Sequence, residues 1–166
     1  MMDRAKEMIF NILGESVRDA RVLDLFAGSG SLGIEALSRG ATHVTFVESG
    51  IWAQKCIREN LERLSLGGKA RVVRKNVFRV FRGLQEKGET FTLIFLDPPY
   101  DQGLVKKLLI QLDHFDIVTP HTQVVLHHSR REKLPKRLEG LKLTREKRFG
   151  QACLSFLFTG RSPATG

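Results

Sequence analysis

Apolar runs of strand length alternate with amphipathic helical stretches along most of the chain, and this alternation limits the possible folds. Five runs read as buried strands: 21–26, 43–48, 71–75, 91–96 and 123–128. Four intervening stretches carry apolar residues at spacings of three and four, as half-buried helices do: 31–38, 51–66, 77–87 and 104–115. Strands that alternate with helices of this length pair in parallel through right-handed crossovers, so the sequence predicts an α/β fold.

The pattern changes after the fifth run. A basic segment, residues 130–140, precedes two further strand-like runs, 141–149 and 153–158. Gly150 and Gln151 suit a turn, so these two runs are predicted to form a hairpin in which one strand is antiparallel to the rest of the sheet. With 166 residues in total, we expect a single domain over residues 1–160 and a frayed tail over residues 161–166.

The charge balance favours a polyanionic partner. Lys and Arg number 27 and Asp and Glu number 18, which gives a net charge of +9. Such an excess favours nucleic acid, although a solvated basic face is the alternative explanation. Cys56 and Cys153 belong to no CxxC pair, so neither a zinc site nor a redox motif is indicated and both are predicted to be core thiols. We find no signal peptide and no membrane-spanning run, and expect a cytoplasmic protein without metal or membrane partners.

Several polar segments should meet at one edge of the sheet, because ligands of open α/β sheets bind outside the carboxyl ends of the parallel strands. These segments are the loop after Phe26, Glu48, the turn at Asn76, the residues 97–100 and the basic segment after His128.

Residues 97–100, with the sequence DPPY, close the fourth strand-like run. A carboxylate and a carbonyl freed by proline geometry can accept two hydrogens from a planar amine, and a neighbouring aromatic ring can stack on a flat base. The stretch therefore suggests chemistry on an amino group. The alternative is a simple strand-to-loop stop, since proline lacks a donor and extends its predecessor.

Gly28, Gly30 and Gly33 match the G-x-G-x-x-G pattern between a strand and a helix. The pattern predicts a backbone that approaches a cofactor at a helix amino terminus, although a purely structural turn remains an alternative. Glu48 ends the second strand, where a carboxylate can accept both hydroxyls of a ribose. Asp24 lies inside the first strand, and a carboxylate buried there needs a cationic or donor partner, such as an ammonium group or amides of its own loop.

Residues 24–30 (DLFAGSG), with Glu48, Asn76 and the DPPY stretch, resemble the class I S-adenosylmethionine-dependent methyltransferases. Residues 3–13, residues 32–41 (LGIEALSRGA) and Phe149-Gly150 resemble, more narrowly, the bacterial 16S ribosomal RNA guanine-N2 methyltransferase family. This resemblance implies a Rossmann-like, seven-stranded and mostly parallel sheet in the order 3-2-1-4-5-7-6, with an antiparallel seventh strand and helices on both faces.

The resemblance also assigns roles to individual residues. Asp24 and the backbone of Gly28, Ser29 and Gly30 would hold the methionine end of S-adenosyl-L-methionine, Glu48 its ribose, and Asn76 with the Val77 amide its adenine. Asn76 could equally cap the following helix, and the two roles are compatible. The predicted catalytic residues are Asp97, the Pro98 carbonyl and Tyr100, which would bind the exocyclic amine and cover the base; the predicted substrate-binding residues are Pro99, Arg130, Arg131 and Phe149.

Three features depart from the family pattern. Family members usually begin earlier, with a basic hairpin and an Arg-Pro-Thr segment, so this chain is expected to be shortened at its amino terminus. Lys6 stands where Arg is usual, and His127 and His128 stand where the fifth strand often carries a carboxylate. Because neighbouring residues of a strand point to opposite faces, these histidines should form no metal site; we expect one to be packed and the other exposed.

The leading hypothesis is methyl transfer to the N2 amine of a guanine in 16S ribosomal RNA, either as RNA or within an assembling small subunit, by a monomer. Alternatives in the same class are DNA adenine, DNA cytosine or protein glutamine as the substrate. The alternatives from other classes are a noncatalytic RNA-binding assembly factor and a nicotinamide dehydrogenase; Asp24 and the DPPY stretch argue against the dehydrogenase.

Overall fold

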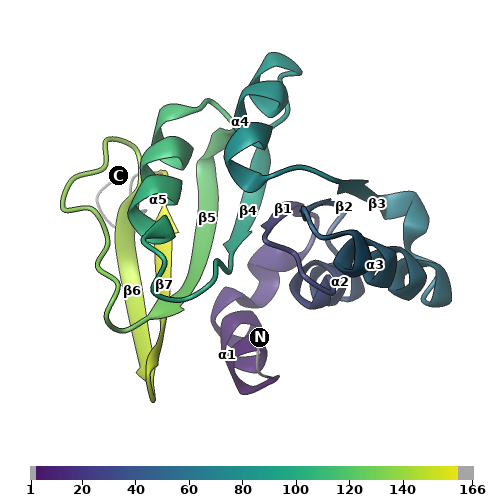
Figure 1. Ribbon diagram of the computed structural model, residues 1–166, viewed down its shortest axis with the longest axis horizontal. Coiled ribbons are helices and arrows are strands. Elements are labelled where there is room, and N and C mark those ends of the chain that lie inside the picture. The colour runs from purple at the N-terminus through teal and green to yellow at the C-terminus, as the bar shows by residue number, and fades with distance from the viewer. Residues whose placement is uncertain (1–2, 161–166) are drawn as a thin grey trace.

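The sheet has seven strands in the order that the family resemblance predicts. A computed structural model describes residues 3–160, and the predicted tail, residues 161–166, lies outside the described part. The strands are β1 (Arg21–Leu25), β2 (His43–Val47), β3 (Ala70–Val73), β4 (Phe91–Leu96), β5 (Val118–Ser129), β6 (Lys142–Phe149) and β7 (Ala152–Phe158). They hydrogen-bond in the order β3-β2-β1-β4-β5-β7-β6 (Figure 1).

Strand β7 is the one that reverses direction. The first five strands pair in parallel, whereas β7 is antiparallel to both β5 and β6. Gly150, with a φ of 58°, lies in the turn between β6 and β7. The predicted hairpin and its antiparallel strand are therefore confirmed.

Within residues 3–160, five α-helices and two short 3-10 helices accompany the sheet. They are α1 (Asp3–Leu13), η1 (Gly14–Val17), α2 (Ser31–Ser38), α3 (Ile51–Arg63), η2 (Gly67–Lys69), α4 (Val77–Glu86) and α5 (Leu104–His114). Helices α1, α2 and α3 cover one face of the sheet, and α4 and α5 cover the other (Figure 1). No helix within residues 3–160 is long and apolar enough to cross a membrane.

Burial on both faces explains why the central strands read as continuous apolar runs. Val22 of β1 joins the cluster that contains Phe10 of α1, while the next residue, Leu23, joins the cluster that contains Phe81 of α4. Alternate residues of one strand thus enter separate cores, as expected for a parallel sheet sandwiched between two helical layers.

Helix α3 ends at Arg63, three residues before the predicted end. Ser65 adopts a left-handed φ of 58°. The Leu66 N–H then donates to the Leu61 carbonyl over 2.9 Å, which closes the helix by a Schellman-type contact. No glycine marks this stop, so the spacing of apolar residues alone overestimates the length of the helix.

Several strand boundaries also differ from the prediction, and those of β1 and β5 have a structural reason. Strand β1 ends at Leu25, because Phe26 turns out of it with a φ of 60°. Strand β5 begins at Val118, five residues before the predicted start, and its pairing with β4 shifts register between Phe91 and Leu93. Polar and proline residues in 118–122 hide this irregular extension from a search for apolar runs.

The two cysteines differ in environment. Cys153 in β7 is buried, as predicted. Cys56 is exposed, so the prediction of a second core thiol is wrong. The buried stripe of α3 consists of Gln54, Ile57 and Leu61, and position 56 lies outside that stripe.

Gly33 lets helix α2 pack closely on the sheet. A Cβ atom at this position would overlap the ring of Phe46 and lie 2.8 Å from Cγ1 of Val44, and both of these β2 residues are fully buried. The third glycine of the loop motif therefore serves helix packing.

A methyl group at residue 33 is expected to destabilise the protein. Gly33→Ala should lower the free energy of unfolding by about 1–3 kcal/mol through overpacking, measured by urea denaturation. Gly83→Ala is the matched control, because a Cβ there would meet no atom within 4 Å in helix α4. The control should raise stability by about 0.5–1 kcal/mol. Equal effects of the two substitutions would contradict the close approach at Gly33.

Candidate active site

The carboxyl ends of β1, β2 and β4 surround one open groove. Its volume is about 510 Å³, and it is lined by Phe26, Glu48, Ser49, Asp97, Pro98, Pro99 and Tyr100. Residues that are far apart in the sequence meet here because the three strands are parallel neighbours. The structure thus brings Glu48 together with the whole DPPY stretch.

Glu48 connects the two loops beside the groove. Its Oε1 accepts a hydrogen bond from the Gly28 N–H over 2.8 Å, and its Oε2 accepts one from the Gly50 N–H over 2.8 Å. Gly28 and Gly30 have φ values of 58° and 84°, which favour glycine. The loop after β1 is therefore held against the end of β2 by a partly buried carboxylate.

Asp24 lies beneath this loop and is only 1% exposed. Its Oδ2 accepts a hydrogen bond from the Gly33 N–H over 3.1 Å. Burial raises the pKa of the Asp24 carboxyl from 3.8 to about 7, the Gly33 N–H opposes this rise, and the charges of Asp97 and Glu48 add to it. The predicted alternative was a contact with amides of its own loop, whereas the observed donor lies in helix α2, just after that loop. Oδ1 has no hydrogen-bond partner among the described residues.

Asp24, Glu48 and Asp97 form a cluster of carboxylates in a chain whose net charge is +9. A buried carboxylate with a single donor is stabilised in its charged form by a nearby cation. This set of acceptors fits S-adenosylmethionine, which carries an ammonium group, a sulfonium and a ribose diol. Within residues 3–160 no group of three or more His, Cys, Asp or Glu residues has the arrangement of a metal site.

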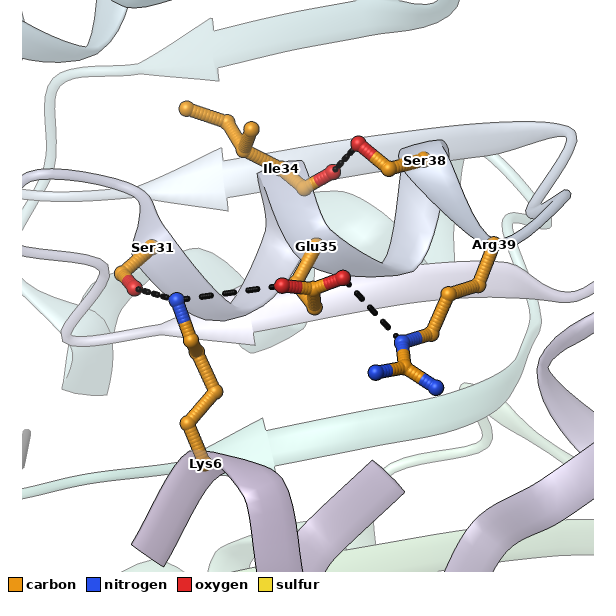
Figure 2. Close-up of polar contacts among 6 residues, drawn as sticks. All are labelled: Lys6, Ser31, Ile34, Glu35, Ser38 and Arg39. Carbon is orange, nitrogen blue, oxygen red and sulfur yellow. Dashed lines mark hydrogen bonds and ion pairs between the residues drawn. The ribbon is translucent and has the colours of Figure 1, made fainter. Parts of the chain in front are cut away.

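Helix α1 contacts the helix that follows the glycine loop. Lys6 Nζ lies 3.2 Å from Ser31 Oγ and 3.8 Å from Glu35 Oε1, and Figure 2 shows both contacts. Glu35 Oε2 in turn accepts a hydrogen bond from Arg39 Nε over 3.1 Å. Since Ser31 directly follows Gly30, Lys6 connects α1 to the end of the loop. Part of the LGIEALSRGA stretch thus serves the contact between α1 and α2.

Asn76 and Val77 do not line the groove. The Asn76 Oδ1 accepts a hydrogen bond from the Phe78 N–H over 2.9 Å, so the predicted helix cap is confirmed. Asn76 lines a separate hollow of about 520 Å³ with Arg74, Lys75 and Arg79. Val77 is buried, and its side chain packs in the core.

The basic segment does not enter the groove. Arg130 Nη1 donates to the Gly150 carbonyl over 3.1 Å, and Arg130 lines a smaller cavity of about 230 Å³ beside His128. The Arg131 N–H donates to Ser129 Oγ over 3.2 Å, and its side chain is exposed. Both arginines therefore lie near the carboxyl end of β5, and neither lines the groove.

His127 and His128 are both buried, with exposed fractions of 8% and 3%, so the prediction that one of them is exposed is wrong. They do point to different surroundings. His128 contacts Ser155 Oγ over 2.8 Å through Nε2, and burial lowers the pKa of this imidazole. His127 Nδ1 lies 2.9 Å from Asp97 Oδ1. β5 lies between β4 and β7, so both histidines are on an interior strand and keep little contact with solvent.

The contact between His127 and Asp97 was missed in the sequence. Leu126 pairs with Leu96 in the sheet, which places the two following residues side by side.

Phe149, a predicted substrate-binding residue, stacks on the His127 ring at 6.2 Å with an interplanar angle of 11° and is absent from the groove lining. Phe26 was also not predicted as a groove residue. Its positive φ is unusual for a bulky residue and often marks a functional loop, but this angle is known only from the structure.

The strand order, the glycine loop after β1 and the groove beyond β1, β2 and β4 define a Rossmann-like methyltransferase. The chain belongs to the family described as "Conserved hypothetical protein 95", whose model matches residues 1–158.

Individual relatives agree with this assignment. The chain is 39% identical over 148 residues to YlbH of Bacillus subtilis, covering 89% of this chain and 80% of that protein. It is 35% identical over 149 residues to the ribosomal RNA small subunit methyltransferase D of Escherichia coli K12, covering 90% and 73%. The solved structure of yhhF from Escherichia coli has a TM-score of 0.84 and 33% identity, covering 96% of this chain and 86% of that one.

Asp24 should make the stability of the free protein depend on pH. Its folded-state pKa of about 7 exceeds the ordinary value of 3.8. The folded protein then binds more protons than the unfolded chain between these values, so this group lowers the unfolding free energy as pH rises from about 4 to about 7. Asp24→Asn, which keeps an oxygen acceptor for Gly33, should remove that loss.

The comparison is urea denaturation of the variant and the wild type at about pH 4 and about pH 8. The advantage of Asp24→Asn should grow by roughly 4 kcal/mol between these conditions, at 1.36 kcal/mol for each unit of pKa. A difference that is independent of pH would show that the Asp24 pKa is not raised.

Proposed function

We propose that this chain transfers a methyl group from S-adenosyl-L-methionine to the exocyclic N2 amine of a guanine in small-subunit (16S) ribosomal RNA. The observation that carries the proposal is the groove in which Asp97, Pro98, Pro99 and Tyr100 face the end of β2 with Glu48. Amine acceptors and a candidate cofactor carboxylate thus share one open site.

The cofactor supplies an electrophilic methyl group on a sulfonium. On the protein side, the free Oδ1 of Asp24 would accept from the ammonium group, together with the backbone of the loop 28–30. Glu48 would accept the ribose hydroxyls while it holds Gly28 and Gly50. The Asn76 Oδ1 already caps α4, so its side-chain NH₂ group is left to bind the adenine edge. The N–H of Val77 would bind the same edge.

Asp97 and the Pro98 carbonyl would bind the exocyclic amine of the guanine. With Oδ1 of Asp97 engaged by His127, Oδ2 has no hydrogen-bond partner among the described residues and can accept an amine hydrogen. This contact would limit delocalisation of the nitrogen lone pair into the base and orient the nitrogen for attack. Tyr100, which is 40% exposed, would stack on a base that has left its helix, with Pro99 beside it.

RNA as the substrate is supported by the name of the Escherichia coli relative and by the net charge of +9. Arg130 and Arg131 would contact phosphates near the site, and Phe149 would act on the substrate through His127. We further propose that the chain works as a monomeric single domain in the cytoplasm, on ribosomal RNA or the assembling small subunit.

The direct test is to incubate the purified chain and methyl-labelled S-adenosylmethionine with one candidate substrate at a time. The substrates are naked 16S RNA, assembled small subunits, duplex DNA and cell protein. Label should appear in RNA as N2-methylguanine at one position, mapped by nuclease digestion and mass spectrometry. Label in DNA or protein would show that the substrate is DNA or protein and not ribosomal RNA. Cofactor binding without any transfer would favour the noncatalytic assembly factor.

Removing the carboxylate at the end of β2 should weaken cofactor binding. Glu48→Ala is expected to raise the Kd for S-adenosylmethionine at least about tenfold, because hydrogen bonds to a charged acceptor are each worth about 1.5–3 kcal/mol. Calorimetry measures the Kd. Glu62→Ala removes an exposed carboxylate of α3 as a control and should leave the Kd unchanged. An unaltered Kd for Glu48→Ala would rule out the ribose role.

Neutralising Asp97 should block methyl transfer but leave the binding of S-adenosylmethionine intact. Asp97→Asn is expected to lower kcat by about 10²–10³-fold, the usual loss for one preorganised electrostatic group. Its Kd for S-adenosylmethionine should stay within about twofold of wild type. Asp101→Asn, an exposed carboxylate just beyond the groove, is the matched control with normal kcat. Parallel losses of kcat and cofactor affinity in Asp97→Asn would instead indicate a structural role.

A further inference from the structure

Three side chains from two neighbouring elements form a continuous hydrogen-bonded chain. Asp97 Oδ1 lies 2.9 Å from Nδ1 of His127, and Nε2 of the same imidazole lies 2.8 Å from the hydroxyl of Tyr100. Both partners of His127 belong to the DPPY stretch after β4, whereas His127 itself is on β5. One imidazole therefore joins the two ends of that stretch.

The chemistry of the partners determines the direction of both hydrogen bonds. An ionised Asp97 can only accept, so Nδ1 of His127 must carry a proton. In the neutral ring Nε2 then lacks a proton and accepts from the Tyr100 hydroxyl. Burial, and next the charge of Asp97, raise the pKa of Tyr100 above its ordinary value of 10.0, so the hydroxyl keeps its proton at neutral pH. A single tautomer of the neutral imidazole therefore satisfies both hydrogen bonds.

The imidazole is held firmly in place. His127 is 8% exposed, and Phe149 of β6 stacks on its ring at 6.2 Å. Its own strand is paired on both sides, with β4 and with β7. In contrast, Asp97 and Tyr100 lie on a loop, Tyr100 is 40% exposed, and the next residue, Asp101, has a positive φ of 55°. A rigid strand thus supports a loop that would otherwise depend on its own backbone for its shape.

We infer that His127 is a positioning residue for methyl transfer, an inference that rests on the proposed function. By donating to Oδ1, it turns the Asp97 carboxylate so that Oδ2 is left for the substrate amine. By accepting from Tyr100, it sets the ring that covers the base. Orientation of the amine then depends on Nδ1, and binding of the base depends on Nε2. The two nitrogens of one side chain serve two separate steps.

This division can be tested with substitutions that keep one nitrogen at a time. Asn at residue 127 places its amide near the position of Nδ1, and Gln places its amide near the position of Nε2. His127→Ala should lower kcat by about 100-fold, the typical loss for a misplaced reacting group. His127→Asn should recover most of kcat but keep a raised KM for RNA. His127→Gln should recover KM but not kcat, and Tyr100→Phe should raise KM alone.

His128→Asn is the matched control, because His128 is equally buried on the same strand but contacts Ser155 and the Ser129 carbonyl. It should lower the melting temperature and leave kcat and KM unchanged. All variants should bind S-adenosylmethionine with the wild-type Kd. Equal kinetics for His127→Asn and His127→Gln, wild-type kcat in His127→Ala, or a loss of cofactor affinity parallel to kcat would each overturn the inference.

A measurement on the free wild-type protein requires no activity and no variant. Nitrogen-15 NMR of the histidine rings should show Nδ1 of His127 protonated at neutral pH, and Tyr100→Phe should shift the Nε2 resonance alone. An Nδ1 without a proton would overturn the inference, whatever the activity. Absence of methyl transfer by wild-type protein with a protonated Nδ1 would instead count against the proposed function, so the two failures can be told apart.

Discussion

β1 lies between β2 and β4, and the parallel hydrogen bonding of these three strands runs out at the same edge of the sheet. A loop follows each strand at that edge, and residues of these loops form the groove. A shift of one residue in either pairing would send Asp24 to the opposite face and separate Glu48 from the glycine loop. The two apolar cores hold this register because alternate residues of β1 are committed to different faces.

Polar interactions refine this arrangement locally. Glu48 joins the loops after β1 and β2, Asp24 joins β1 to helix α2, and His127 joins the loop after β4 to β5. Each of the three is a contact between a strand end and a backbone amide or side chain of another element. The residues expected to bind the cofactor and the substrate thus also fix the geometry of the loops in which they lie, and a substitution there acts on local structure and on binding together.

The sequence was sufficient for the features that depend on local pattern. Alternating strand and helix signals predicted the parallel sheet, Gly150 predicted the hairpin turn, and Asn76 predicted the cap of α4. It failed where the outcome depends on contacts between distant elements. The end of α3 follows from the left-handed Ser65, the burial of both histidines follows from the neighbours of β5, and the partner of His127 follows from the register of Leu96 with Leu126. None of these can be read from spacing within one segment, and the strand order itself came from the family resemblance.

The carboxylates at the groove stand in a chain that carries nine more positive than negative side chains. A nucleic acid is drawn toward such a protein over distances comparable with the Debye length. At the groove itself the sign reverses, and a phosphate that entered would be repelled by Glu48 and Asp97. The base and the ribose are uncharged, so under the proposed function a base can enter without this penalty. The local reversal of charge would then act as a filter that keeps the phosphates outside and admits the base.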